Sequence, residues 1–367
     1  MLEYPKVNYG CQTEDMDGKR FPTSNRQILL ASRPSGQPSR DNFQIVETEV
    51  PKPGNGQILL RTIYLSLDPY MRGRMDPGPS YAPRVEIGEV MVGRSVCEVV
   101  ESKIPNYWPG DIVLAGGGWQ EYVLSVGAEI RKIDHFPGSI SQSLGVLGMP
   151  GLTAYTGLLN IGKPKQGETL VVAAASGAVG SVVGQIAKIK GCRVVGIAGG
   201  EEKCRFVKDE LEFDACVDHR QPDLADRLKA VCSNGIDIYF ENVGGHVLEA
   251  GLPLLNNFAR IPVCGLIAHY CATDLPTGPN RVPELMGAIL KKRLTFQGVI
   301  VVDYASQFPD FMTDMSAWMK EGRVKYREDI VDGLENAPQE LIRLLRGENF
   351  GKKIIRVSPE PPPRCVD

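Results

Sequence analysis

The chain has 367 residues, of which 43% are hydrophobic and 23% charged, and its formal net charge is −3. This length favours about two domains, each large enough to bury its own core. The small charge argues against nucleic acid and anionic membranes as partners, and no apolar run approaches the roughly 18 residues of a membrane span.

Residues 1–24 are polar and show no periodicity, which predicts a loosely ordered N-terminal arm. They also lack the basic-then-apolar pattern of a secretory signal. The nine cysteines are scattered and form no CxxC pair, so we expect reduced thiols and a cytoplasmic location. Neither the cysteines nor the four histidines have the spacing of zinc ligands, so we predict no metal site.

Residues 25–147 consist of short strand-like runs separated by proline and glycine turns. This pattern predicts a compact, partly antiparallel, barrel-like domain. We expect its strands near residues 27–32, 43–46, 57–66, 90–100, 111–114 and 121–124.

From residue 148 to 323 the pattern changes to alternating strands and helices. Six strands with right-handed crossovers predict a doubly wound parallel sheet, the Rossmann architecture of the α/β class. We expect strands from Thr169 and near 193–198, 214–218, 236–241, 260–265 and 294–301, and helices near 181–190, 203–211, 223–232, 246–256 and 283–292.

Residues 324–367 return to strand-like sequence, including 352–357. The simplest arrangement adds this segment to the β-rich domain, which would then comprise 25–147 and 324–367, with the dinucleotide-binding domain at 148–323. The proline-rich end at 358–364 is expected to be extended and exposed.

The most informative motif is Ala175-Ser-Gly-Ala-Val-Gly180, a dinucleotide-binding turn whose first glycine is replaced by alanine. Gly177 would let a pyrophosphate approach the backbone, and Gly180 and Gly184 would let the following helix pack closely on the sheet. The phosphates would then lie at the positive end of that helix. The alternative is an ordinary strand–turn–helix unit built from small residues.

The second strand of this unit ends at Gly199-Gly200, where a NAD site usually carries an acidic residue for the ribose hydroxyls. Two glycines leave room for a 2′-phosphate, and Lys203 offers it a cation, so the sequence favours NADP(H) over NAD(H). The alternative is a solvated Lys203 that pairs with Glu201 or Glu202.

Four longer motifs, at residues 65–75, 145–157, 241–245 and 349–352, resemble those of the zinc-independent medium-chain dehydrogenases/reductases. The resemblance is strongest to the leukotriene/prostaglandin reductase and alkenal double-bond reductase branch, and within it to the bacterial NADPH-dependent curcumin reductases. It covers roughly residues 25–357. It implies a Rossmann domain with a smaller GroES-like domain, an active site in the cleft between them, and a homodimer.

The resemblance also assigns cofactor contacts within the glycine motif. Gly177 and Gly180 would bind the pyrophosphate, with Ser176 and Val179 beside them in the turn. Gly199 would lie near the ribose.

Further cofactor contacts follow from the same resemblance. Lys203 would bind the 2′-phosphate, Arg220 could add charge, and His219 stands where relatives often have a tyrosine. Asn242 and Cys264 end the fourth and fifth strands, where the cofactor must cross, although Asn242 could instead cap a turn and Cys264 could fill the core.

Three more residues complete the predicted site. Asn349 resembles the asparagine that holds the nicotinamide amide, and Tyr270 matches a tyrosine near the substrate carbonyl. Tyr64 is a further catalytic candidate, with a half-buried strand aromatic as the alternative. An Arg72–Asp68 pair is expected to fix the loop between them.

These features predict an NADPH-dependent reductase of carbon–carbon double bonds conjugated to a carbonyl, acting on small enones or enals. Hydride addition to the β-carbon would place negative charge on the carbonyl oxygen, and Tyr270 would donate a hydrogen bond there. Two alternatives remain: an NADPH quinone reductase of the same fold, and a non-catalytic NADPH-binding or structural protein.

Overall fold

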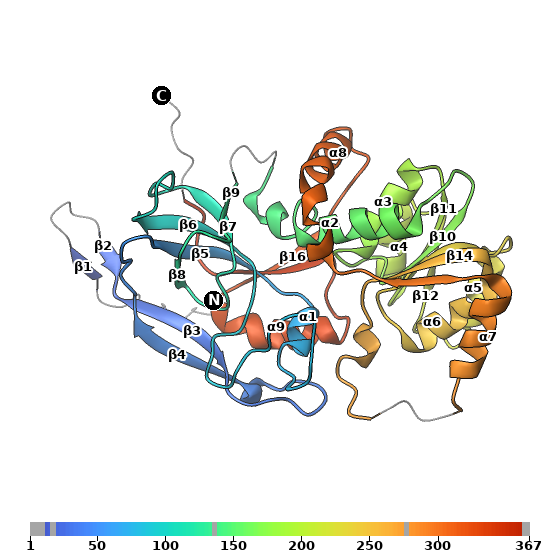
Figure 1. Ribbon diagram of the computed structural model, residues 1–367, viewed down its shortest axis with the longest axis horizontal. Coiled ribbons are helices and arrows are strands. Elements are labelled where there is room, and N and C mark those ends of the chain that lie inside the picture. The colour runs from blue at the N-terminus through green and yellow to red at the C-terminus, as the bar shows by residue number, and fades with distance from the viewer. Residues whose placement is uncertain (1–11, 15–19, 134–137, 275–278, 362–367) are drawn as a thin grey trace, which may run out of the picture.

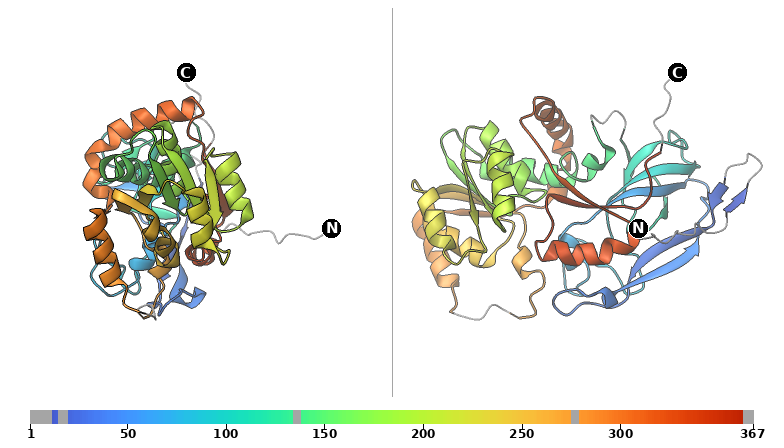
Figure 2. Two further views of the ribbon diagram at one scale, coloured as in Figure 1. Left: turned by 90° about the vertical axis from the view of Figure 1, so that its right-hand side faces the viewer. Right: turned by 180° about the vertical axis from the view of Figure 1, so that it is seen from behind.

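A computed structural model describes residues 12–14, 20–133, 138–274 and 279–361. Figure 1 shows two lobes: one holds the antiparallel strands from the first part of the chain, drawn blue to teal, and the other holds a parallel sheet covered by helices. The last part of the chain crosses back from the second lobe to the first (Figure 2). No helix among the described residues is long and apolar enough to cross a bilayer.

The parallel lobe is built on one six-stranded sheet of order β12-β11-β10-β13-β14-β15, with every neighbouring pair parallel. This arrangement confirms the predicted doubly wound fold. The strands are β10 (Thr169–Ala173), β11 (Arg193–Ala198), β12 (Ala215–Asp218), β13 (Ile236–Phe240), β14 (Leu255–Val263) and β15 (Thr295–Gly298). The helices between them are α3 (Gly180–Ile189), α4 (Glu201–Asp209), α5 (Leu224–Val231), α6 (Gly245–Gly251) and α7 (Val282–Lys292).

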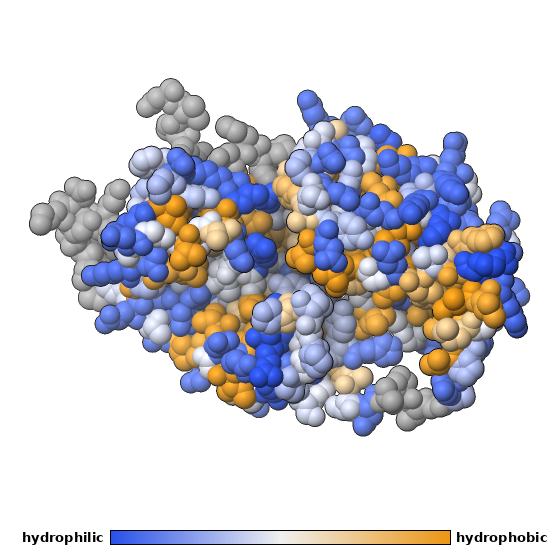
Figure 3. Space-filling view, viewed as in Figure 1, coloured by the Kyte–Doolittle hydropathy of each residue, from blue (hydrophilic) through white to orange (hydrophobic). Residues whose placement is uncertain are grey.

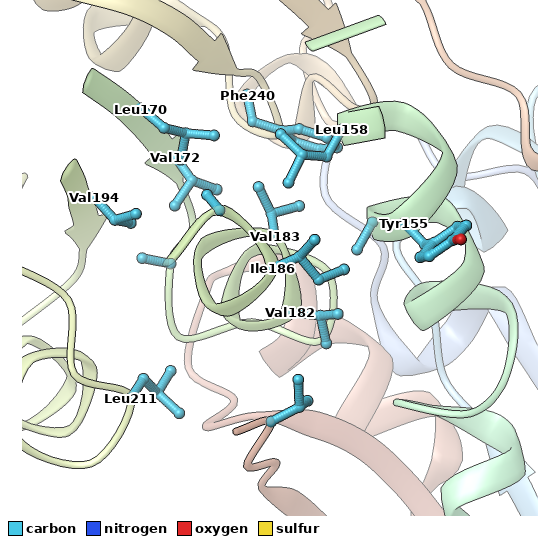
Figure 4. Packing of buried hydrophobic residues seen from close by; sticks show 14 of the residues in the cluster. Tyr155, Leu158, Leu170, Val172, Val182, Val183, Ile186, Val194, Leu211 and Phe240 are labelled. Atoms are coloured by element: carbon cyan, nitrogen blue, oxygen red, sulfur yellow. The ribbon is translucent and has the colours of Figure 1, made fainter. Parts of the chain in front are cut away.

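The core of this lobe explains why α3 lies where it does. All five residues of β10 are buried, as a strand covered on both faces requires. The apolar face of α3, with Val182, Val183 and Ile186, packs on that sheet (Figure 4). Helices α2 (Met149–Thr156) and α8 (Phe308–Lys320) join the same cluster from the side where the lobes meet.

The other lobe contains a separate seven-stranded sheet of order β16-β17-β5-β6-β7-β9, with β8 also paired to β5, and a hairpin of β3 and β4. Its central strand β5 (Ile58–Ser66) pairs antiparallel with β17 (Lys352–Arg356) from the far end of the chain. The remaining elements are β3 (Ser24–Leu30), β4 (Phe43–Glu49), α1 (Tyr70–Gly73), β6 (Ser95–Ser102), β7 (Ile112–Ala115), β8 (Tyr122–Ser125), β9 (Arg131–Lys132) and β16 (Glu328–Asp332).

Three features of the chain ends differ from expectation. The N-terminal arm contains two short antiparallel strands, β1 (Gln12–Glu14) and β2 (Arg20–Pro22). The segment after residue 324 contains helix α9 (Ala337–Leu345) between its two strands. Of the expected proline-rich end, residues 358–361 are described, and they are tied to β5 because Ser358 donates to the carbonyl of Thr62.

Candidate active site

The glycine motif forms a tight turn between β10 and α3. Ala174 takes a left-handed conformation, with φ of 54°, one residue before the alanine that replaces the first glycine. A side chain on Gly180 would lie 2.3 Å from the carbonyl oxygen of Ala174, and one on Gly184 would lie 1.9 Å from the ring of Phe213. Gly180 is therefore required for the close approach of α3 to the turn after β10, and Gly184 for the contact of α3 with Phe213, which lies between α4 and β12.

The same turn meets the other lobe. Gly177 forms a parallel backbone bridge with Gly351, which precedes β17. Ser176 is buried beside Gly177, and Val179 is half-buried at the start of α3. Asn349 lies in the facing loop, where its amide donates to the carbonyl of Gly351 at 2.9 Å.

A group of cationic side chains gathers at the ends of β11 and β12. A side chain on Gly199 would lie 2.8 Å from Nε2 of His219 and 3.1 Å from Nε of Arg220, so the absence of one lets these two side chains pack against the end of β11. Lys203 donates to the carbonyl of Gly347 at 2.7 Å. Burial and the neighbouring charge of Arg220 lower the pKa of Lys203. Lys203 and Arg220 form the cationic group, and His219 lies beside them.

The alternative pairing of Lys203 with an acidic neighbour is not observed. Glu201 pairs instead with Arg205, and the hydrogen bond of Lys203 crosses to the loop after α9. His219 faces His246, with ring centroids 5.9 Å apart. Burial and that second histidine lower the pKa of His219, which favours its neutral form near pH 7.

Asn242 joins the ends of two strands. Its amide donates to the carbonyl of Ala173 at 2.8 Å, and thus links the end of β13 to the end of β10. The turn that follows is held instead by Glu241, whose buried carboxylate accepts from the amides of Val243 and Gly244. The suggestion that Asn242 caps this turn is therefore wrong. Burial raises the pKa of Glu241.

Cys264 and Tyr270 follow the end of β14, next to Asn242. Burial raises the pKa of Cys264 to about 12, so the thiol is uncharged at neutral pH. The hydroxyl of Tyr270 accepts from the amide of Leu266 at 3.3 Å and lies 3.0 Å from the position that a side chain on Gly265 would take. The Tyr270 ring packs against the core of the antiparallel lobe.

Two tyrosines from the antiparallel lobe join Tyr270. Burial raises the pKa of Tyr270, and Cys264 and Tyr81 add to that shift. Tyr81 and Asp68 in turn contribute to the raised pKa of Tyr70, for which burial is the main cause. Tyr70 and Tyr270 also pack against the same hydrophobic cluster, so these two tyrosines from different lobes border one neighbourhood. The sequence reasoning missed Tyr70, although it stands within the Leu65–Met75 motif.

Tyr64 does not lie in this neighbourhood. Its hydroxyl donates to Glu360 at 2.7 Å, and its ring packs with Ile63 and Val96 in a separate cluster. Burial and the bond to Glu360 raise its pKa to about 12. The structure therefore favours the packing role for Tyr64 over the catalytic one.

The loop before Tyr70 is held by a different ion pair from the one expected. Asp68 pairs with Lys352 at 2.6 Å, and both side chains are buried. Arg72 pairs instead with Asp76 and donates to the carbonyl of Gly36. The expected Arg72–Asp68 pair is therefore wrong, and the buried Asp68–Lys352 pair joins the loop to β17.

A cavity of about 330 Å³ opens beside Tyr70 in the antiparallel lobe. Arg74, Arg94 and the backbone of Gly116–Gly118 contribute to its lining. Nε of Arg74 is buried and has no hydrogen-bond partner among the described residues. Within the same part of the chain, no group of three or more His, Cys, Asp or Glu side chains is arranged to hold a metal ion.

Comparison with known families covers both lobes. Residues 26–133 match a family described as the N-terminal domain of oxidoreductase, and residues 178–318 match one described as zinc-binding dehydrogenase. The chain is 59% identical to the NADPH-dependent curcumin reductase of Escherichia coli over 335 residues, which are 91% of this chain and 97% of that protein. It is 38% identical to the NADP⁺-dependent 2-alkenal reductase of Nicotiana tabacum over 92% of this chain and 98% of that protein. It is 40% identical to prostaglandin reductase 1 of Bos taurus over 88% of this chain and 95% of that protein.

The fold has close counterparts among solved structures. CurA of Vibrio vulnificus in complex with NADPH superposes with a TM-score of 0.89 at 56% identity, covering 91% of this chain and 99% of that one. A quinone oxidoreductase of Escherichia coli superposes with a TM-score of 0.70 at 18% identity, covering 90% of this chain and 99% of that one. At this identity, the likeness shows only that the two proteins share a fold.

Proposed function

This chain belongs to the zinc-independent branch of the medium-chain dehydrogenases/reductases, and we propose that it reduces the carbon–carbon double bond of α,β-unsaturated ketones and aldehydes with NADPH. The observation that carries the proposal is the 59% identity to a curcumin reductase over nearly the whole of both chains. The alkenal and prostaglandin reductases among its relatives also have names that point to enone and enal chemistry.

The residues between the lobes fit NADPH. Gly177 and Gly180 carry no side chains, so a pyrophosphate could lie against the backbone amides of the turn. Gly199 leaves the end of β11 without a side chain beside the cationic group, which supplies charge for a 2′-phosphate. Asn349, in the loop that bridges to Gly177, would hold the nicotinamide amide.

When bound, NADPH supplies the hydride that the β-carbon of the substrate accepts. The chain itself must stabilise the negative charge that develops on the carbonyl oxygen. Tyr270 suits this role because its raised pKa keeps the phenol protonated at neutral pH, and the amide of Leu266 fixes its hydroxyl oxygen. Tyr70, which packs against the same cluster as Tyr270, would border the same substrate. The α-carbon would then take its proton from Tyr270 or from solvent.

A substrate panel tests this proposal. Purified protein with NADPH should reduce alkenals, enones and dienones to the saturated carbonyl compounds, faster than it reduces quinones. Product analysis by mass spectrometry distinguishes double-bond reduction from carbonyl reduction. Turnover of quinones alone would indicate the quinone reductase alternative, and NADPH binding with no turnover of the panel would indicate the non-catalytic one.

We further propose a homodimer formed through α7 and β15. Val282, Met286 and Leu290 repeat every four residues along α7, and between 57% and 77% of each side chain is exposed. Figure 3 shows hydrophobic residues gathered over this helix. β15 is the outermost strand of the parallel sheet, so its backbone offers a second copy an edge to pair with.

The dimer proposal is tested by light scattering at several concentrations. The unmodified protein should have the mass of two chains, and Met286→Glu with Leu290→Glu should yield single chains that remain folded by circular dichroism. Trp108→Glu, an exposed residue of the other lobe, is the matched control and should leave the dimer intact. A monomeric unmodified protein would contradict the proposal.

We also propose that the protein works in the cytoplasm. The seven cysteines among the described residues are free thiols, as is usual in a reducing compartment. Fractionation of cells that express the native gene, followed by immunodetection, tests this location.

A further inference from the structure

Two cysteines lie in contact beside the cationic group. Cys204 is in the first turn of α4, directly after Lys203, and Cys216 is in β12, three residues before His219. The thiol of Cys216 donates to the sulfur of Cys204 at 2.9 Å. Both side chains are only half-buried, so small reagents can reach them.

The pair has the asymmetry of an attacking and a resolving thiol. The hydrogen bond from Cys216 lowers the pKa of Cys204, although burial opposes this shift. The same hydrogen bond and burial raise the pKa of Cys216. Because the thiolate is the form that reacts with peroxides, Cys204 is the first site of attack.

We propose that Cys204 and Cys216 form a reversible disulfide on exposure to a hydroperoxide, and that this disulfide weakens binding at the cationic group. The second part rests on the proposed function, since it takes the 2′-phosphate of NADP(H) as the ligand there. The Cys204 thiolate attacks the peroxide, and with one proton this gives the sulfenic acid and an alcohol. The Cys216 thiol then displaces water from that sulfur. Overall, two thiols and one hydroperoxide yield one disulfide, one alcohol and one water.

The effect on the cofactor follows from which element can move. β12 is fixed by parallel pairing with β11 from Ala215 to Asp218, whereas Cys204 lies in the first turn of α4, directly after the Gly199-Gly200 turn. Closing the two sulfurs from 2.9 Å to about 2.05 Å would therefore draw this first turn of α4 toward β12. Lys203, the neighbour of Cys204, would move with it, which would disturb its hydrogen bond to Gly347.

Peptide mapping tests the first part of the proposal. The full-length protein is treated with tert-butyl hydroperoxide, its remaining thiols are alkylated, and the unreduced digest is analysed by mass spectrometry. We expect a cross-link between the peptides of Cys204 and Cys216, with the loss of two hydrogen atoms, that dithiothreitol reverses. Cys204→Ser and Cys216→Ser should each abolish it, and Cys232→Ala, a buried thiol at the end of α5, should retain it.

A different cross-link, or over-oxidation of Cys204 with no cross-link, would overturn the proposal. The mapping of the unmodified protein does not depend on the variants. It therefore shows whether the Cys204–Cys216 disulfide forms even where a variant folds poorly.

Nucleotide affinity tests the second part. The affinity for NADP⁺ should fall about tenfold in the oxidised protein, as expected for a weakened charge-assisted hydrogen bond, whereas that for NAD⁺, which lacks the 2′-phosphate, should not change. By reciprocity, saturating NADP⁺ should raise the reduction potential of the disulfide by about 30 mV. Equal affinity for NADP⁺ in both redox forms would overturn this coupling. A reduced protein that binds no NADP⁺ would instead contradict the proposed function and leave the cross-link result unaffected.

Discussion

The hydroxyl of Tyr270 is the group on which the proposed chemistry most depends. Tyr270→Phe removes only that hydroxyl, whose oxygen contacts the amide of Leu266. We expect enone turnover to fall by about 10²–10³-fold, the range for loss of one donor to a developing oxyanion. Steady-state kinetics with an alkenal measures this change, and the Kd for NADPH should stay the same.

A second measurement separates catalysis from packing at this position. Quinone turnover by Tyr270→Phe should fall less than enone turnover, because quinones need less stabilisation of an enolate. Tyr64→Phe is the matched control, since its hydroxyl contacts Glu360 away from the cleft. An unchanged kcat for enones in Tyr270→Phe would contradict the mechanism.

Lys203 should decide the choice between the two nicotinamide cofactors. Lys203→Ala removes a cation next to Arg220, near the end of β11. The KM for NADPH should rise by an amount equivalent to about 1.5–3 kcal/mol, the value of a hydrogen bond to a charged group, while that for NADH stays nearly constant. Lys208→Ala, further along α4, should change neither. Equal use of both cofactors by the unmodified protein would contradict this assignment.

The tyrosines show which residues of the candidate site could be predicted from the sequence and which could not. Tyr270 could be named because its surroundings resemble those of a family tyrosine that lies near the substrate carbonyl. Tyr70 was missed, although it stands within the motif of residues 65–75. The packing role of Tyr64 could not be predicted from the sequence around it. It depends on β17 pairing with β5, which sets Arg356 opposite Tyr64, and that register is set by a strand almost 300 residues away.

At the scale of elements, the contact between α3 and Phe213 should be sensitive to a single methyl group. Gly184→Ala would place a carbon 1.9 Å from the buried ring, so the core must shift. We expect a loss of roughly 1–3 kcal/mol in the free energy of unfolding, as for other overpacked cores. Denaturation in urea measures it. Gly287→Ala, in α7 with no atom within 4 Å of the new side chain, should instead leave stability equal or increase it.

The turn after β13 should make stability depend on pH through Glu241. Burial raises the pKa of this carboxyl in the folded protein, so the folded state binds more protons than the unfolded state above pH ~4.3. Its contribution to stability is present below that pH and is lost as pH rises through the folded pKa. In Glu241→Gln the difference in unfolding free energy between pH 5 and pH 8 should be smaller than in the unmodified protein. Glu202→Gln, on the exposed side of α4, should leave that difference unchanged.

The two lobes differ in how well their elements could be predicted. The inner strands of the parallel sheet include continuous apolar runs such as Leu170–Ala173, which is fully buried, and amphipathic helices separate them, so their pattern is distinct. Helix α9 was missed because it is a nine-residue segment between two strands. Its apolar positions Leu341, Leu344 and Leu345 have the spacing of a helix face, but the segment was assigned together with the strands on either side of it.

At the scale of the whole molecule, we expect activity without a metal ion. The described residues contain no cluster of three potential ligands, and the proposed chemistry assigns charge stabilisation to hydroxyl groups. Enone reduction should therefore survive exhaustive dialysis against a chelator, and elemental analysis should find no stoichiometric zinc. Loss of activity on chelation that added zinc restores would contradict the prediction.

The last strand of the chain completes the first sheet. β17 pairs with the second half of β5, at Leu65 and Ser66, almost 290 residues after β5 itself has been made. During synthesis on the ribosome, the backbone of that part of β5 therefore has no β17 to pair with until the end of the chain is made. The parallel sheet of residues 169–298 contains all of its own strands and can form earlier. The sheet that is translated first is the last to be finished, and a nascent chain that ends before residue 352 presents the edge of β5 to other chains as a template for aggregation.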